Sequence, residues 1–136
     1  MATFASQCIS SGALRRLRSF TLTIGLYVSM TDWVPSVVHL LSASPLELFQ
    51  IYSAGAFLDS STTSELLKQL ILMHGKRLLR ISIHRMPIDW EAIRSVCVQC
   101  TKLEQLFLVV DPNDLVCSSP VHLGLAVTHP NVFRLG

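Results

Sequence analysis

Charged residues are scarce in this chain, and the basic ones form no dense run. Only 15% of the 136 residues are charged, and 11 Lys and Arg against 9 Asp and Glu leave a formal net charge of +2. This balance argues against a nucleic-acid-binding arm, so we expect no nucleic-acid partner. Half of the residues are hydrophobic, which excludes a disordered chain. One domain of this length buries roughly two-thirds of its unfolded surface, enough for a core.

Long apolar runs are also missing. No window holds the roughly 18 consecutive apolar residues of a membrane span, and polar residues and prolines interrupt the long uncharged stretch 115–133. Residues 1–16 show no basic head followed by an apolar block, so no secretory signal is expected. The four cysteines are therefore expected to be reduced thiols. We expect a cytoplasmic or nuclear protein that does not bind membranes.

One six-residue pattern recurs along the chain. Residues 103–108 have the form L-x-x-L-x-L, and the same form, with Leu, Phe or Ile at its apolar positions, starts at residues 17, 46 and 78. A truncated copy starts at residue 132. The starts are 25 to 32 residues apart, and such intervals are typical of repeats in which each copy forms one supersecondary unit. Because the copies are short and rich in Leu, Ile, Phe and Val, they predict buried parallel strands.

A residue suited to a helix N-cap precedes each strand start by fourteen positions. These residues are Thr3, Asp32, Ser64, Asp89 and Ser118. Thr62, which forms a capping box with Glu65, is an earlier alternative to Ser64, and Ser119 before Pro120 is an alternative to Ser118. Apolar residues at helical spacing follow them, as in the segment 66–71, so a helix is predicted between consecutive strands. Because no strand–helix unit can bury its apolar faces alone, neighbouring units must stack.

The segment 100–108 reads C-x-x-L-x-x-L-x-L and resembles the leucine-rich repeat family, in the irregular long-repeat form found in F-box proteins, particularly those of fungi. The resemblance covers about residues 14–136. It implies an α/β fold, a short right-handed solenoid of about four and a half repeats, with a curved parallel sheet on the concave side and helices on the convex side. A ubiquitin-ligase adaptor role is implied only if the parent protein carries an F-box, which has no counterpart in this sequence.

We expect the whole chain, residues 1–136, to form a single domain, with residues 1–13 as the remnant of a preceding repeat. Solenoids need polar capping repeats for solubility, and neither end of the sequence reads as one. The chain is therefore expected to be a fragment of a longer protein. A dimer joined through an end is the competing interpretation.

Alternation along the expected strands predicts which side chains line the concave face. These residues are Ser19, Thr21, Thr23, Leu48, Gln50, Tyr52, Arg80, Ser82, His84, Gln105, Phe107, Val109 and Arg134. Solenoids present such faces to proteins, and Tyr and Arg are favoured at interfaces. We expect a protein partner to contact Leu48, Gln50, Tyr52, Arg80, Ser82, His84, Gln105 and Phe107. The alternatives are a solvated face, or one covered by a missing segment.

Residues that could carry chemistry form no complete site. Cys97 and Cys100 have the C-x-x-C spacing, but they fall at the end of an expected helix, where the dipole opposes a thiolate. His84 lacks an evident nucleophile or orienting carboxylate, and His74 is expected in a last helical turn, where a positive charge suits the dipole. We expect no catalytic residue, no metal and no cofactor.

The sequence thus favours a non-catalytic protein–protein interaction scaffold. In a complete parent it would be the substrate-recognition region of an F-box-like protein. Two alternatives stay open, namely a truncated structural fragment without activity of its own and a thiol oxidoreductase that uses Cys97 and Cys100.

Overall fold

A computed structural model describes the chain except for residues 1, 26–29, 55–59, 111–124, 130–131 and 136. Its elements, in chain order, are α1 (Ala2–Ser10), the short 3-10 helix η1 (Ala13–Arg16), β1 (Ser19–Ile24), α2 (Met30–Leu41), β2 (Leu48–Ser53), α3 (Ser60–His74), β3 (Arg80–Ile88), α4 (Trp90–Gln99), β4 (Gln105–Val110), β5 (Leu125–His129) and β6 (Val132–Leu135). Within the described part of the chain, no helix combines the length and apolar character needed to cross a membrane.

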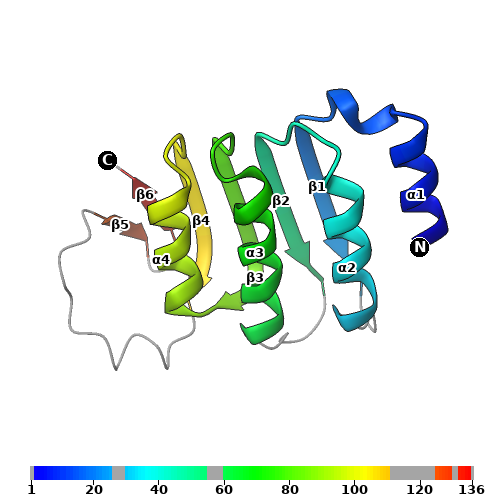
Figure 1. Cartoon of the computed structure of the whole chain (residues 1–136). Coiled ribbons are helices and arrows are strands. Elements are labelled where there is room, and N and C mark those ends of the chain that lie inside the picture. Colours follow the sequence, from blue (N-terminus) through cyan, green and yellow to red (C-terminus); the bar gives the residue numbers. More distant parts are fainter. Residues whose placement is uncertain (1, 26–29, 55–59, 111–124, 130–131, 136) are drawn as a thin grey trace.

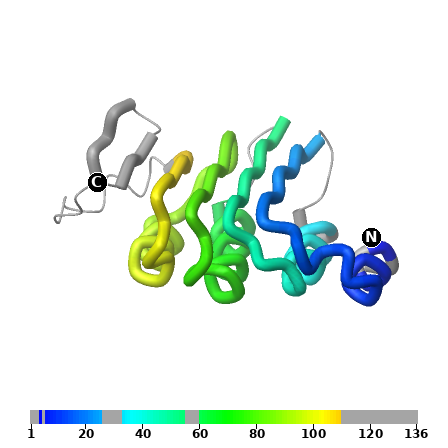
Figure 2. Tube along the Cα trace, turned by 90° about the horizontal axis from the view of Figure 1, so that it is seen from above, coloured from blue at the N-terminus to red at the C-terminus, as the bar shows by residue number. Residues whose placement is uncertain are grey.

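Four parallel strands form the centre of the fold. The strand order of the single sheet is β1-β2-β3-β4-β6-β5, and the pairs β1–β2, β2–β3 and β3–β4 are parallel. Helices α2, α3 and α4 lie in front of these strands, and each helix connects one strand to the next (Figure 1). Each of these connections is a right-handed crossover. Seen from above, the helices form one layer and β1 to β4 another (Figure 2). The predicted α/β fold with a parallel sheet is therefore confirmed for the first four strands.

Apolar side chains from successive strands form continuous rows beneath the helices. Phe20 pairs with Phe49, Phe49 with Ile81, and Ile81 with Leu106. Phe49, Ile81 and Leu106 are almost fully buried, and the rings of Phe20 and Phe49 stack with their centroids 6.3 Å apart. Leu66 and Leu67 of α3 complete this core with no exposed surface. Burying such a side chain contributes about 1.5–3 kcal/mol, so the rows fix which face of every strand points inward.

The last strand contradicts the expectation of a fifth parallel repeat. β6 pairs with β4 in the antiparallel sense, with Leu106 opposite Phe133, and β5 forms an additional antiparallel strand along β6. Only residues 130 and 131 separate β5 from β6, and a connection this short joins only antiparallel strands. The expected helix before residue 132 is thus wrong where the structure describes it. The candidate cap Ser118, and the side chain of Arg134, lie outside the described part.

Of the candidate helix caps, only Asp89 takes that role among the described side chains. Its carboxylate accepts a hydrogen bond of 2.7 Å from the backbone N–H of Ala92, in the first turn of α4. Ser64 lies inside α3, because that helix begins four residues earlier, at Ser60. Its buried hydroxyl instead accepts a hydrogen bond of 3.0 Å from the backbone N–H of Asp89. Thr3 and Asp32 also fall inside helices, so these expected caps are wrong.

Replacing Asp89 by alanine should lower the free energy of unfolding by about 1 kcal/mol, because a first-turn N–H of α4 loses its acceptor. Asp89→Asn is the matched control, since asparagine caps helices about as well as aspartate. Urea denaturation measures both. Equal loss of stability in the two variants would contradict a capping role.

His74 lies at the end of α3 in a buried position with an exposed fraction of only 3%. Burial lowers the pKa of His74 below its ordinary value of 6.5, the charge of Arg77 lowers it further, and a hydrogen bond to the backbone of Leu41 acts in the opposite direction. The Nε2 atom is buried without a hydrogen-bond partner among the described residues. The expectation that the helix dipole favours a cation here is therefore wrong, since desolvation dominates.

The stability of the chain should fall in mild acid because of His74. The unfolded chain takes up the proton near pH 6.5, whereas the folded chain resists it, so the free energy of unfolding should be highest above that pH and decrease below it. His74→Gln should show a flatter pH dependence in denaturant titrations between pH 7.5 and 5.5. A decline as steep in His74→Gln as in the unmodified chain would exclude His74 as its source.

Candidate functional site

The open face is defined here as the outward-pointing side chains of β1 to β4, on the side of the sheet opposite the helices. The parallel register arranges them in rows across the strands. One row contains Ser19, Leu48, Arg80 and Gln105, the next contains Thr21, Gln50, Ser82 and Phe107, and the third contains Thr23, Tyr52 and His84. All eight residues expected to contact a partner therefore belong to the same side of the sheet. Leu48 and Tyr52 are 39% and 38% exposed, so this surface includes accessible apolar area.

Ser82 differs from the expectation because it has no exposed surface. It is the smallest residue of its row and stands between Gln50 on β2 and Phe107 on β4. Its hydroxyl forms a hydrogen bond of 2.6 Å with Nε2 of His84, the next residue on the same face. Ser82 therefore orients His84 and, without exposed surface of its own, supports the face from beneath.

Arg80 and Phe107 form one cation–aromatic pair on the open face. The guanidinium carbon of Arg80 lies 5.3 Å from the centroid of the Phe107 ring on the neighbouring strand. Such a contact at an exposed site contributes about 0.5–1 kcal/mol. It also covers an aromatic ring that would otherwise meet water, while the guanidinium keeps donors for a ligand. The pair thus presents a charge and an apolar surface together.

Arg85 and Tyr52 form a second pair, which depends on a bulge in β3. The register between β3 and β4 shifts between Ser82 and Pro87, and Arg85 adopts a left-handed backbone with φ of 60°. The guanidinium carbon of Arg85 lies 6.0 Å from the Tyr52 ring centroid, and Nη1 donates a hydrogen bond of 3.3 Å to the Tyr52 hydroxyl. The His84 ring lies 6.4 Å from the same tyrosine ring. The bulge thereby places Arg85 on the open face, whereas strict alternation along β3 would point its side chain to the other side of the sheet.

Sequence alternation did not identify Arg85 as a candidate site residue. An uninterrupted strand would turn its side chain toward the helices, where a charge is costly. Pro87 was the available signal, because a proline inside a sheet is confined to edges, strand starts and bulges. The structure adds Arg85 to the predicted group of Tyr52, Arg80, His84 and Phe107.

The Cys97–Cys100 pair lies at the C-terminal end of α4, on the other side of the sheet. Cys97 is half-buried and Cys100 is buried, and both are free thiols. Burial raises the pKa of Cys97, and burial together with the charge of Cys97 raises the pKa of Cys100 to about 11. A thiolate nucleophile requires the opposite shift. No group of three or more His, Cys, Asp or Glu residues in the described part is placed to hold a metal ion.

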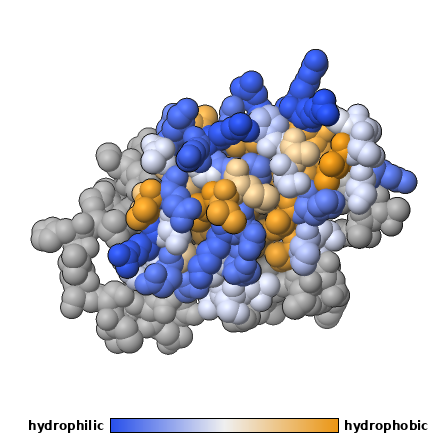
Figure 3. All heavy atoms as spheres, in the orientation of Figure 1, coloured by the Kyte–Doolittle hydropathy of each residue, from blue (hydrophilic) through white to orange (hydrophobic). Residues whose placement is uncertain are grey.

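The helix side offers a different surface. Leu72 and Val98 are its most exposed large apolar residues, at 76% and 69%. Figure 3 shows this side with apolar residues interspersed among hydrophilic ones. Single exposed apolar residues of this kind are ordinary on protein surfaces.

Comparison of the chain with known protein families, with curated proteins and with solved structures finds no match.

The two thiols should be unreactive in the folded chain. At pH 7.5, iodoacetamide should modify Cys97 and Cys100 far more slowly in the native chain than in guanidinium chloride, because the raised pKa and burial both limit the thiolate. Peptide mass spectrometry separates the two sites. Faster labelling of either cysteine in the native chain would instead support the thiol oxidoreductase alternative.

Proposed function

We propose that this chain is a non-catalytic protein-interaction scaffold whose binding surface is the open face. The observation that carries the proposal is the pair of arginines held over aromatic rings, Arg80 over Phe107 and Arg85 over Tyr52. Arg and Tyr are enriched at the centres of protein interfaces, where they account for a large share of the binding energy. Here both arginines lose side-chain freedom before a partner arrives, which lowers the entropic cost of binding.

The shape of the surface supports a protein ligand. Four in-register strands form a broad face with accessible apolar area at Leu48 and Tyr52. Thr21, Gln50 and Gln105 are interspersed with them on the same face and supply polar groups without charge. Protein-binding surfaces commonly combine apolar and polar area.

In the finer version of the proposal, the four parallel units belong to a leucine-rich-repeat-like solenoid, in the manner of the substrate-recognition region of an F-box-like protein. The recurrent strand–helix unit and its right-handed crossovers support this version. This version implies a cytoplasmic or nuclear location. It implies a role in a ubiquitin ligase only if a longer parent protein contains an F-box. A structural fragment without activity is the alternative.

The double variant Tyr52→Ala/Phe107→Ala should lose partner binding while keeping its fold. Photo-crosslinking from position 50 on the open face, followed by mass spectrometry, would identify the bound protein. Both arginines lose their aromatic supports in this variant, so we expect at least a tenfold weaker interaction, or about 1.4 kcal/mol.

Leu72→Ala/Val98→Ala is the matched control, since it removes two exposed apolar side chains from the helix side. Circular dichroism and thermal unfolding verify that both variants fold. Equal crosslinking by the Tyr52→Ala/Phe107→Ala variant and the unmodified chain would reject the open face as the binding surface.

A further inference from the structure

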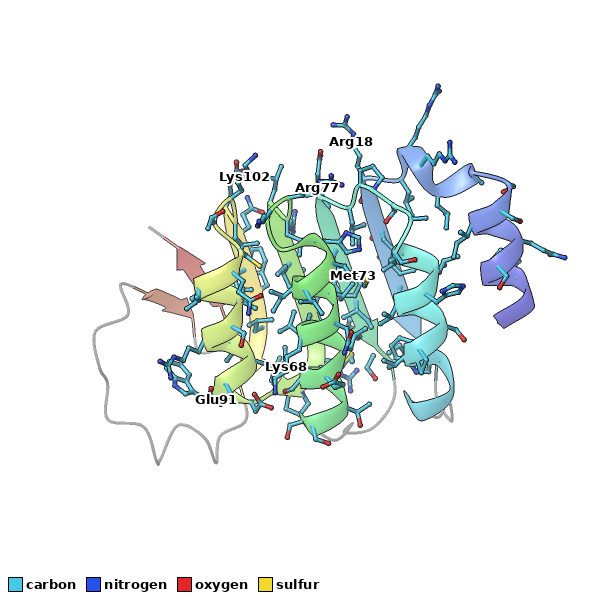
Figure 4. The ribbon with its side chains drawn as sticks, viewed as in Figure 1. Arg18, Lys68, Met73, Arg77, Glu91 and Lys102 are labelled. Atoms are coloured by element: carbon cyan, nitrogen blue, oxygen red, sulfur yellow. The ribbon has the colours of Figure 1, made fainter. Side chains whose placement is uncertain are left out.

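Basic side chains gather along one edge of the sheet, the edge at which the parallel strands begin. In a parallel sheet with helical crossovers, all segments that lead from a helix into the next strand meet at this edge. The segments before β1, β2, β3 and β4 contribute Arg15, Arg16, Arg18, Glu47, Lys76, Arg77, Lys102 and Glu104. Arg18, Arg77 and Lys102 project from it in the same direction (Figure 4). We call these eight residues the strand-start edge, and six of them are basic.

Little on the strand-start edge neutralises this charge. Arg18 and Glu47 form an ion pair of 3.1 Å, with the arginine side chain 70% exposed. No other ion pair connects residues within the described part of the chain. The carboxylates Glu65, Asp89 and Glu91 lie in α3, before α4 and in α4, toward the opposite edge. Basic residues therefore outnumber carboxylates six to two on the strand-start edge, whereas the opposite edge carries these carboxylates together with Lys68.

The open face continues this positive surface. Among its described side chains are Arg80 and Arg85, and none is a carboxylate. Helix dipoles explain cations that follow helix ends, such as Lys76, Arg77 and Lys102. They do not explain Arg80 and Arg85, which lie on the sheet side away from the helices.

The backbone conformation of Arg85 supports a functional role for its positive charge. For a residue other than glycine, the left-handed backbone conformation costs about 1–2 kcal/mol relative to the right-handed conformation. Glycine avoids that cost. The contacts of Arg85 with Tyr52 offset part of it. Backbone strain of this kind is concentrated at functional sites.

We propose that the partner of the open face is an acidic protein segment, with its carboxylates on Arg80 and Arg85 and its most acidic part toward the strand-start edge. This proposal rests on the proposed function and specifies the chemistry of the partner. The two arginines lie five residues apart on β3, which is less than about 16 Å along the strand because the bulge shortens it. Between them the face is uncharged and partly apolar, which suits a peptide with separated carboxylates better than closely spaced phosphates.

Selection of random 12-residue peptides by mRNA display on the full chain tests this proposal. Selected peptides should be enriched in Asp and Glu, and Tyr52→Ala/Phe107→Ala should abolish their binding. Arg80→Gln/Arg85→Gln should lower the affinity for the selected peptides about tenfold for each arginine removed, as expected for charge-assisted hydrogen bonds. Arg77→Gln/Lys102→Gln should weaken them severalfold and reduce the dependence on salt.

The control Lys68→Gln/Arg94→Gln removes the same charge from α3 and α4 and should leave binding within about twofold, as expected when only long-range, screened attraction changes. Arg85→Gly is a second variant, which should lose affinity while melting no lower than the unmodified chain, because glycine relieves the left-handed backbone.

The possible outcomes separate the two proposals. Selected peptides that need Tyr52 and Phe107 but carry no excess of carboxylates would overturn the acidic partner and leave the proposed function standing. Peptides that are insensitive to the Tyr52→Ala/Phe107→Ala variant would overturn both. A 12-nucleotide single-stranded DNA that binds more tightly than the best peptide, through Arg80 and Arg85, would show that the partner is a nucleic acid.

Discussion

Helices on one side of a parallel sheet impose the constraint on which this structure depends. Each strand must bury one set of alternate side chains beneath α2, α3 or α4, and the parallel register then aligns the remaining set in rows on the other side. Phe49, Ile81 and Leu106 hold the register, because slipping any strand by one residue would expose an apolar row and bury a polar one. The composition of the open face is thus a consequence of the core.

The same topology accounts for the distribution of charge. Parallel strands with helical crossovers collect all helix-to-strand connections at one edge, so the basic residues of four separate segments become neighbours without any being close in sequence. Arg80 stands at the junction of that edge and the open face, above Phe107. A ligand that contacts the aromatic residues would therefore meet positive charge both at the strand starts and at the β3 bulge.

Strand positions and the inward or outward direction of their residues were predictable from sequence, because both follow from a period of two in the apolar pattern. The group formed by Leu48, Gln50, Tyr52 and Phe107 was found in this way. Arg85 was not, because its orientation depends on a register shift between β3 and β4 and not on alternation. The burial of Ser82 depends on its neighbours on two other strands, and the burial of His74 depends on a contact between helices. A local sequence pattern encodes neither kind of contact.

The ends of helices and the last strands were less predictable for a similar reason. Counting a fixed distance back from each strand found the true cap at Asp89 but placed Ser64 at a helix start, whereas that serine lies inside α3 and binds the Asp89 backbone. Extension of the repeat to residue 132 predicted another strand parallel to β4, whereas β6 pairs with β4 in the antiparallel sense and follows β5 after only two residues, without a helical crossover. A repeat pattern predicts where apolar segments fall, and the connections decide their direction.

Disulfide mapping of paired cysteines on β1 and β2 tests the parallel register most directly. Thr23 and Tyr52 are direct neighbours across the two strands, whereas Ser19 lies four residues before Thr23, about 13 Å along the strand. Under mild oxidation, Thr23→Cys/Tyr52→Cys should form a disulfide and Ser19→Cys/Tyr52→Cys should not, because the bond needs Cα atoms within about 7 Å. The reverse result would indicate antiparallel strands and would remove the open face, with everything inferred from it.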